Sequence, residues 1–222
     1  MQYNDKLILA VPKGRILSEV MPIIYEAGIE PEAAFGDEMV RQLRFTTNIP
    51  YLDIIRVRSF DVATFVAFGA AHMGVVGNDV LLEFDYSEIY APLDLKIGHC
   101  RISVAEPKLE NQNEDLVKKS SIKVATKYPK VTRKYFSAKG IQAECIKLSG
   151  AIELAPQLGL CRKIVDLIST GATLEANGLV EMEKICDVTS KLAVNRIALK
   201  TGYLSIEKWV DKFGEVVDAP KN

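Results

Sequence analysis

Residues 164–178 read Ile164-Val165-Asp166-Leu167-Ile168-Ser169-Thr170-Gly171-Ala172-Thr173-Leu174-Glu175-Ala176-Asn177-Gly178. The apolar, β-branched beginning of this segment is typical of a buried strand. The Ser-Thr-Gly triplet predicts a tight turn, and residues 172–176 predict a short helix that ends at Asn-Gly. A strand, a hydroxyl-rich turn and a helix start in this order indicate an anion site. Free backbone N–H groups point outward there, and the hydroxyls of Ser169, Thr170 and Thr173 add donors.

Asp166 precedes this turn, where its carboxylate can accept hydrogen bonds from sugar hydroxyls. We interpret the segment as a ribose-phosphate site. A Ser-Thr-Gly turn is also an ordinary connection between a strand and a helix, so the motif alone leaves both interpretations open. The spacing Asp-x-x-Ser-Thr-Gly-x-Thr-Leu resembles the loops with which phosphoribosyltransferases bind the 5′-phosphate of phosphoribosyl pyrophosphate. Two families carry such a loop.

The composition excludes several classes of function. The 222 residues contain 28 Lys plus Arg against 29 Asp plus Glu, so no overall field attracts nucleic acid or a membrane surface. The sequence shows no membrane-length apolar run and no signal peptide, and we expect a cytoplasmic protein. Four dispersed cysteines and two histidines do not form a metal-ligand pattern, so we expect reduced thiols and no protein-held metal.

A second anion-binding candidate lies near the N-terminus. Residues 7–11 are a short apolar run, and Pro12-Lys13-Gly14-Arg15 separates this predicted strand from an amphipathic helix that stops near Gly28. Ligands bind at the carboxyl ends of strands in open α/β sheets, which is where Lys13 and Arg15 lie. A solvated charged turn is the alternative interpretation.

Alternating strand and helix patterns predict an α/β protein with mainly parallel sheets. We predict two lobes, the first formed by residues 1–97 and 188–222 and the second by residues 98–187, with a cleft between them. Residues 93–98 are expected to cross between the lobes, and residues 106–108 together with 110–115 to form a polar surface loop. A long β-type run is expected over residues 180–193, followed by one helix over residues 195–213.

Several further motifs occur in an order that resembles the short form of the ATP phosphoribosyltransferase family over nearly the whole chain. Besides the two loops described above, they are Arg58-Ser59-Phe60-Asp61-Val62, Gly74-Val75-Val76-Gly77-Asn78-Asp79-Val80-Leu81, Leu93-Asp94-Leu95-Lys96-Ile97, Ala125-Thr126-Lys127-Tyr128 and Glu153-Leu154-Ala155-Pro156.

This resemblance implies a fold of two lobes like that of type II periplasmic binding proteins. It implies an enzyme that joins N1 of ATP to C1 of phosphoribosyl pyrophosphate and releases pyrophosphate, the first step of histidine biosynthesis, with substrate-bound Mg²⁺. It also implies a homodimer core within a hetero-oligomer, whose partner is a regulatory subunit resembling histidyl-tRNA synthetase.

The roles that we assign to single residues depend on this resemblance. Residues 169–173 (Ser169, Thr170, Gly171, Ala172 and Thr173) would hold the 5′-phosphate, and Glu153 and Asp166 would bind the ribose hydroxyls. Lys13, Arg15 and Arg41 would stabilise the leaving pyrophosphate and the ATP phosphates. Weaker candidates for ATP binding are Gly14, Arg58 and Asp94.

Two alternative functions are considered. A type I purine or pyrimidine phosphoribosyltransferase usually has two adjacent acids before its phosphate loop, whereas Val165 precedes Asp166 here. A two-lobed solute- or effector-binding module would share the fold without any chemistry. The sequence also departs from the family pattern at His72 and Asn78; we interpret His72 as a packing substitution and assign neither residue a role.

Overall fold

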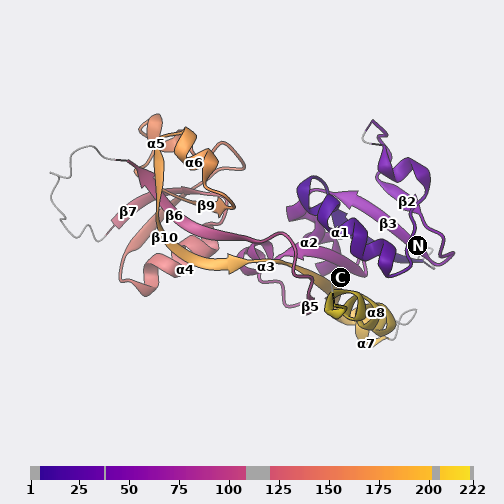
Figure 1. Cartoon of the computed structure of the whole chain (residues 1–222). Helices are drawn as coiled ribbons and strands as arrows, with labels where there is room; N and C mark the ends of the chain where they lie inside the picture. Colours follow the sequence, from indigo (N-terminus) through magenta and orange to yellow (C-terminus); the bar gives the residue numbers. More distant parts are fainter. Residues whose placement is uncertain (1–5, 38, 109–120, 202–205, 221–222) are drawn as a thin grey trace. The chain divides into compact units, whose positions relative to one another are not determined.

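The computed structural model describes residues 6–37, 39–108, 121–201 and 206–220. The chain divides into two compact units, the first made of residues 1–98 with 189–222 and the second of residues 99–188 (Figure 1). The polar loop expected over residues 106–108 and 110–115 is wrong at its start, because residues 106 and 107 pair with residues 179 and 180 at the end of a strand; residues 110–115 lie outside the described residues.

The first unit contains a six-stranded sheet with the strand order β2-β3-β1-β4-β11-β5. Its strands are β1 (Leu7–Pro12), β2 (Arg44–Thr46), β3 (Leu52–Val57), β4 (Met73–Gly77), β5 (Ile89–Asp94) and β11 (Ser190–Asn195). Its helices are α1 (Arg15–Glu26), the 3₁₀ helix η1 (Ala33–Gly36), α2 (Ser59–Ala67), α3 (Asn78–Phe84), α7 (Arg196–Lys200) and α8 (Ile206–Asp218).

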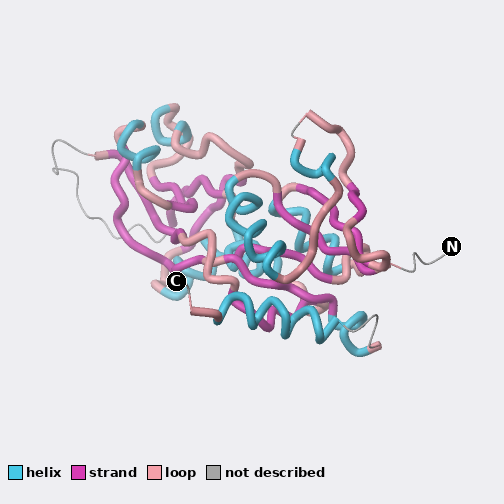
Figure 2. The backbone as a smooth tube through the Cα atoms, turned by 45° about the vertical axis from the view of Figure 1, so that its right-hand side comes forward, coloured by secondary structure: helices cyan, strands magenta, loops and turns pink. Residues whose placement is uncertain are grey.

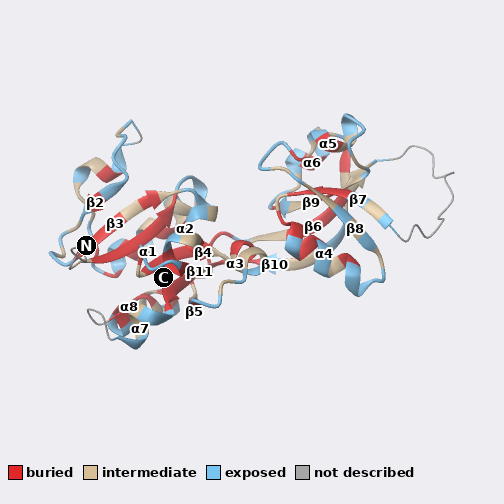
Figure 3. Ribbon diagram, turned by 180° about the vertical axis from the view of Figure 1, so that it is seen from behind, coloured by how far each residue is buried: buried red, intermediate tan, exposed pale blue. Residues whose placement is uncertain are grey.

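Strand β1 lies at the centre of this unit, and all six of its residues are buried (Figure 3). Leu7, Leu9 and Val11 pack into one core together with α1 and α8. The alternate residues Ile8 and Ala10 pack into a second core with α2 and α3. Successive side chains of a strand point to opposite faces, so a continuous apolar run is what a sheet covered on both faces requires.

The second unit contains a five-stranded sheet with the order β10-β6-β9-β7-β8. Its strands are β6 (Cys100–Pro107), β7 (Ser121–Thr126), β8 (Gln142–Lys147), β9 (Lys163–Ile168) and β10 (Leu179–Val188). Its helices α4 (Pro129–Ala138), α5 (Leu154–Gln157) and α6 (Ala172–Ala176) lie beside the strands (Figure 2). Leu174 of α6 and Ala155 of α5 pack against Ile164 and Ile168 of β9.

Both sheets are mixed, whereas the sequence favoured mainly parallel ones. Three strands run parallel in each sheet, β3-β1-β4 in the first and β9-β7-β8 in the second. Each of the remaining strands pairs antiparallel with its neighbours: β2, β11 and β6 with a strand of these groups, β5 with β11, and β10 with β6. The expected long β run is divided at Thr189 into β10 and β11, which belong to different sheets. The chain therefore passes from β10 in the second unit directly into β11 of the first sheet. A strand that paired parallel with its sequence neighbour in the same sheet would instead need a crossover connection, usually a helix.

The C-terminal segment also differs from the expected single helix, since α7 and α8 are separate elements. Asn195 caps α7, because its Oδ1 accepts hydrogen bonds from the N–H groups of Ile197 and Ala198. None of the described helices is long and apolar enough to span a membrane. None of the four cysteines, all of which the structure describes, forms a disulfide.

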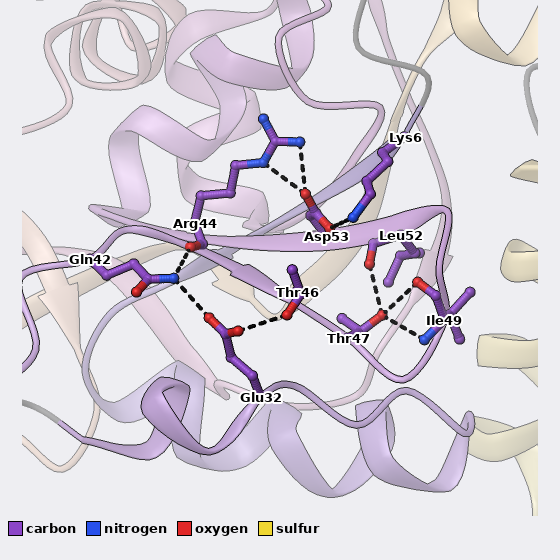
Figure 4. Close-up of polar contacts among 9 residues, drawn as sticks. All are labelled: Lys6, Glu32, Gln42, Arg44, Thr46, Thr47, Ile49, Leu52 and Asp53. Atoms are coloured by element: carbon purple, nitrogen blue, oxygen red, sulfur yellow. Dashed lines mark hydrogen bonds and ion pairs between the residues drawn. The ribbon is translucent and has the colours of Figure 1, made fainter.

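The edge of the first sheet is held by a buried carboxylate (Figure 4). Asp53 on β3 is only 4% exposed and accepts hydrogen bonds from Lys6 Nζ at 2.9 Å and from Arg44 Nε at 2.8 Å. Glu32 accepts hydrogen bonds from Gln42 Nε2 and Thr46 Oγ1, both at 2.7 Å. These bonds attach the short strand β2 and the chain before it to the rest of the sheet.

We predict that Asp53→Asn lowers the free energy of unfolding by about 1–3 kcal/mol, since hydrogen bonds to charged groups are lost at a buried acceptor. Urea denaturation followed by circular dichroism measures the change. The matched control is Asp218→Asn, which removes the exposed ion pair with Lys96 in the same unit and should cost less than about 1 kcal/mol. Equal effects of the two substitutions would contradict the role given to Asp53.

His72 connects β1 to the start of β4. Its ring Nδ1 accepts a hydrogen bond from the backbone N–H of Ile8 at 2.9 Å, and the backbone N–H of His72 donates to the carbonyl of Ile8 at 3.0 Å. Burial lowers the pKa of this imidazole. A neutral ring accepts the hydrogen bond and a protonated ring does not, so the interpretation of His72 as a packing residue agrees with these contacts.

The lowered pKa predicts the direction of a pH effect. His72 in the unfolded chain binds a proton near pH 6.5, and in the folded chain only at lower pH. The stability that the neutral His72 contributes to the fold is therefore complete above about pH 6.5. That contribution is lost as the pH falls through the folded-state pKa. We expect His72→Asn, whose amide oxygen accepts without titrating, to lose less stability than the parent chain between pH 7.5 and 5. Urea midpoints across this range measure it, and parallel pH curves would refute the assignment.

Candidate functional site

The turn predicted to bind phosphate connects β9 to α6 in the second unit. Ser169 and Thr170 follow the strand directly, and Gly171 occupies the N-cap position of α6 with φ +87°. A Cβ atom at Gly171 would meet nothing within 4 Å, so the left-handed backbone and not crowding favours glycine here. Ser169, Thr170, Ala172 and Thr173 are exposed. The turn therefore presents hydroxyl groups to solvent, as the sequence suggested.

Backbone donors are available in the same turn. The first intrahelical bond of α6 joins the N–H of Glu175 to the carbonyl of Gly171 at 3.1 Å, so the N–H groups of Thr173 and Leu174 precede the helical bonding pattern. Helix α6 has only five residues, and its dipole is correspondingly small. Anion binding at this turn would depend on individual N–H and hydroxyl donors.

Two candidate ribose ligands lie in the same unit as this turn. Asp166 is half-buried on β9, and its Oδ1 accepts a hydrogen bond from the N–H of Leu167 at 2.8 Å. Glu153 is half-buried at the position that precedes α5. Among the described residues, no three His, Cys, Asp or Glu side chains are grouped closely enough to hold a metal ion.

The basic loop leaves the carboxyl end of β1 in the first unit, where it was expected. The N–H of Lys13 donates to the carbonyl of Val57 at 2.9 Å, which fixes the start of the loop. Gly14 has φ +84° and ψ −150°, a conformation open almost only to glycine. Arg15 is the first residue of α1 and pairs with Glu19, with Nε and Oε1 3.5 Å apart. All three loop residues are exposed.

The arginines of the first unit fall into two groups, those whose guanidinium contacts the fold and those that lie on the surface. Arg44 donates to Asp53, and Arg56 is almost fully buried. Arg41 lies in the segment that precedes β2, is exposed, and forms no ion pair with any residue that the structure describes. Arg15 and Arg41 therefore keep guanidinium groups on the surface of this unit.

Arg56 has a structural task that the sequence did not reveal. Its Nη1 donates to the carbonyl of Phe35 at 2.9 Å, and its Nη2 lies 3.3 Å from the carbonyl of Asp37. Its guanidinium also lies over the rings of Phe35 and Phe45, 5.6 and 5.3 Å from their centroids. These contacts hold the chain segment that leads to Arg41. The sequence feature that could have indicated this task is the presence of an arginine within the apolar strand at residues 52–57.

The two weaker candidates occupy different settings. Arg58 is exposed, and its carbonyl accepts hydrogen bonds from the first turn of α2. The carboxylate of Asp94 accepts from the N–H of Lys96 at 2.9 Å and from the hydroxyl of Thr189 at 2.7 Å. Asp94 thus joins the end of β5 to the residue before β11, and its role in ATP binding stays a prediction.

The family model described as HisG, ATP phosphoribosyltransferase, matches residues 58–215 of this chain. A curated relative from Rhodospirillum rubrum, named ATP phosphoribosyltransferase, is 63% identical over 215 residues, which are 97% of this chain and 95% of the relative. A relative of the same name from Citrifermentans bemidjiense is 46% identical over 93% of this chain and 96% of its own length.

Solved structures agree with these relatives. A chain from the ATP phosphoribosyl transferase (HisG:HisZ) complex of Thermotoga maritima superposes with a TM-score of 0.79 at 31% identity, over 96% of this chain and all of that chain. The VFT2 domain of Bordetella pertussis BvgS matches with a TM-score of 0.62 at 12% identity, over 97% of this chain and 88% of that domain, and so shares the fold alone. With the family model and close relatives in agreement, this chain belongs to the ATP phosphoribosyltransferase family, which catalyses the first step of histidine biosynthesis.

Proposed function

We propose that the turn at residues 169–173 binds the 5′-phosphate of phosphoribosyl pyrophosphate and that the chain transfers this phosphoribosyl group to N1 of ATP. The observation that carries the proposal is the Ser169-Thr170-Gly171 turn with its two exposed hydroxyl residues, which follows a strand containing Asp166 and precedes a helix start. N–H and hydroxyl donors at such a turn suit a phosphate dianion. Asp166 and Glu153 then accept hydrogen bonds from the ribose 2′- and 3′-hydroxyls.

The reaction requires little acid–base chemistry from the protein. The lone pair of adenine N1 attacks C1 of the ribose, the bond from C1 to the pyrophosphate oxygen breaks, and its electron pair leaves with pyrophosphate. The protein aligns the two reacting atoms and stabilises the charge that develops on the leaving group. Arg15 and Arg41, together with Lys13, carry this second task, because guanidinium groups bind phosphate oxygens in pairs and keep their charge.

We assign the binding of ATP to the first unit as well. Gly14 exposes the backbone of the basic loop to a phosphate, and Arg58 supplies a further exposed cation. Asp94 completes this set, although its carboxylate oxygens already accept hydrogen bonds within the unit. We place Mg²⁺ on the phosphate oxygens of the substrates, since it binds such oxygens while keeping several of its waters.

We further propose a cytoplasmic hetero-oligomer. The Thermotoga maritima relative was solved as a HisG:HisZ complex, and its similarity supports a regulatory partner for this chain as well. That partner would resemble histidyl-tRNA synthetase, with a homodimer of this chain as the core. Size-exclusion chromatography of the chain, with and without the partner, tests this assembly.

One assay tests the proposed reaction directly. The purified chain, mixed with ATP, Mg²⁺ and phosphoribosyl pyrophosphate, should produce the near-ultraviolet absorbance of N1-ribosylated adenine. The partner subunit is included in a parallel reaction. Adenine, guanine and orotate serve as alternative acceptors. Product from one of these acceptors and none from ATP would favour a type I phosphoribosyltransferase, and binding without turnover of any acceptor would favour a solute-binding module.

We expect Arg15→Ala and Arg41→Ala each to lower kcat by about 10²–10³ at saturating substrates, the usual effect of losing one donor that stabilises developing charge. Stopped-flow or steady-state measurement of product absorbance gives kcat. The matched control is Lys208→Ala, which removes an exposed cation from α8 of the same unit. Unchanged turnover in both arginine variants would remove these residues from the leaving-group role.

A further inference from the structure

Three polar side chains lie on the sheet strands next to the phosphate turn, and none of them belongs to the residues assigned above. Arg101 on β6 donates from Nε to Glu181 Oε1 at 2.6 Å, and its Nη2 forms an ion pair with Glu181 Oε2. Ser103 Oγ donates to the same Glu181 Oε1 at 2.7 Å. The remaining arm of Arg101, Nη1, donates to the carbonyl oxygen of Ser169 at 3.0 Å.

These residues share one face of the second sheet with the turn. In the antiparallel ladder Arg101 lies opposite Ile168, and Ser103 lies opposite Asp166. Directly opposed residues in such a ladder project to the same face. Ile168 packs with Leu174 of α6 in one core cluster, so this is the face that α6 covers. Figure 1 shows β6, β9, β10 and α6 together in the second unit.

Arg101 is held in place by its carboxylate partner. The side chains of Arg101 and Glu181 are 30% and 26% exposed, and two arms of the guanidinium bind the two carboxylate oxygens. This hydrogen bonding raises the pKa of Arg101 and lowers the pKa of Glu181. Because the guanidinium is planar and rigid, fixing two of its arms also fixes the direction of the third.

The geometry of a peptide unit connects this contact to the anion site. A trans peptide is planar, so the carbonyl of Ser169 and the N–H of Thr170 point in opposite directions. A carbonyl held toward Arg101 therefore directs the N–H of Thr170 away from the sheet strands. We propose that Arg101, fixed by Glu181 and Ser103, is a positioning residue that orients the Ser169–Thr170 peptide so that the N–H of Thr170 donates to the 5′-phosphate. This inference rests on the proposed function of the turn.

The test measures binding of phosphoribosyl pyrophosphate in the presence of Mg²⁺ by isothermal titration calorimetry, alongside binding of ATP. We expect Arg101→Met to raise the Kd for phosphoribosyl pyrophosphate about tenfold, the effect of one misdirected hydrogen bond, and to leave the Kd for ATP unchanged. Arg101→Lys keeps the charge but not the planar fork, and we expect it to restore only part of the affinity.

The matched control is Lys139→Met. It breaks the ion pair between Lys139 and Glu183, two residues further along β10 than Glu181, and Lys139 makes no contact with the turn among the described interactions. This variant should bind both substrates like the parent chain. If Arg101→Met does not fold, as judged by its thermal melt, the Arg101→Lys variant decides the question alone.

Each outcome has a separate meaning. Parent-like binding of phosphoribosyl pyrophosphate by Arg101→Met, or full recovery of affinity in Arg101→Lys, would overturn the positioning role. An equal loss in Lys139→Met would overturn it as well, since the effect would then follow from any broken ion pair on β10. A parent chain that binds no phosphoribosyl pyrophosphate, with or without its partner subunit, would overturn the proposed function of the turn first.

Discussion

Burial of β1 on both faces is the constraint on which the first unit depends. All six residues from Leu7 to Pro12 lie inside, with alternate side chains in two separate cores. A strand enclosed in this way has no place for a charge, so cations can follow only where the chain leaves the sheet. Lys13 and Arg15 occur at this exit, on either side of a glycine with φ +84°. The apolar core and the basic loop are thus two consequences of one strand.

The same constraint explains how the arginines of this unit are divided. Arginines that remain near the sheet are occupied by the fold, Arg44 by the carboxylate of Asp53 and Arg56 by backbone carbonyls and two aromatic rings. Arginines beyond the sheet, such as Arg41, stay exposed. With a net charge of only −1, the chain as a whole does not attract a polyphosphate, and attraction must come from such local groups.

The candidate anion site of the second unit uses neutral donors, whereas that of the first unit uses cations. Its turn carries no cation of its own, and the nearby Arg101 has its charge balanced by Glu181. Neutral donors remain, namely hydroxyl groups and backbone N–H groups whose directions are set by the surrounding hydrogen bonds. Such donors recognise the shape of a phosphate group and keep it at one position, whereas exposed arginines suit a charge that develops and leaves.

Local patterns in the sequence determined the elements and the two candidate loops. The apolar run at residues 7–11, the turn at Ser169-Thr170-Gly171 and the short helix over residues 172–176 all occur where their residue types predicted them, because burial and backbone preference act over a few neighbours. Contacts between distant residues depended on tertiary structure. The division of one β run at Thr189, the use of Asp94 to join β5 to β11, and the bond from Arg101 to Ser169, 68 residues away, arise from strand pairing. No local pattern encodes which strand lies beside another. The partner of a polar side chain is therefore decided only when the strands have paired.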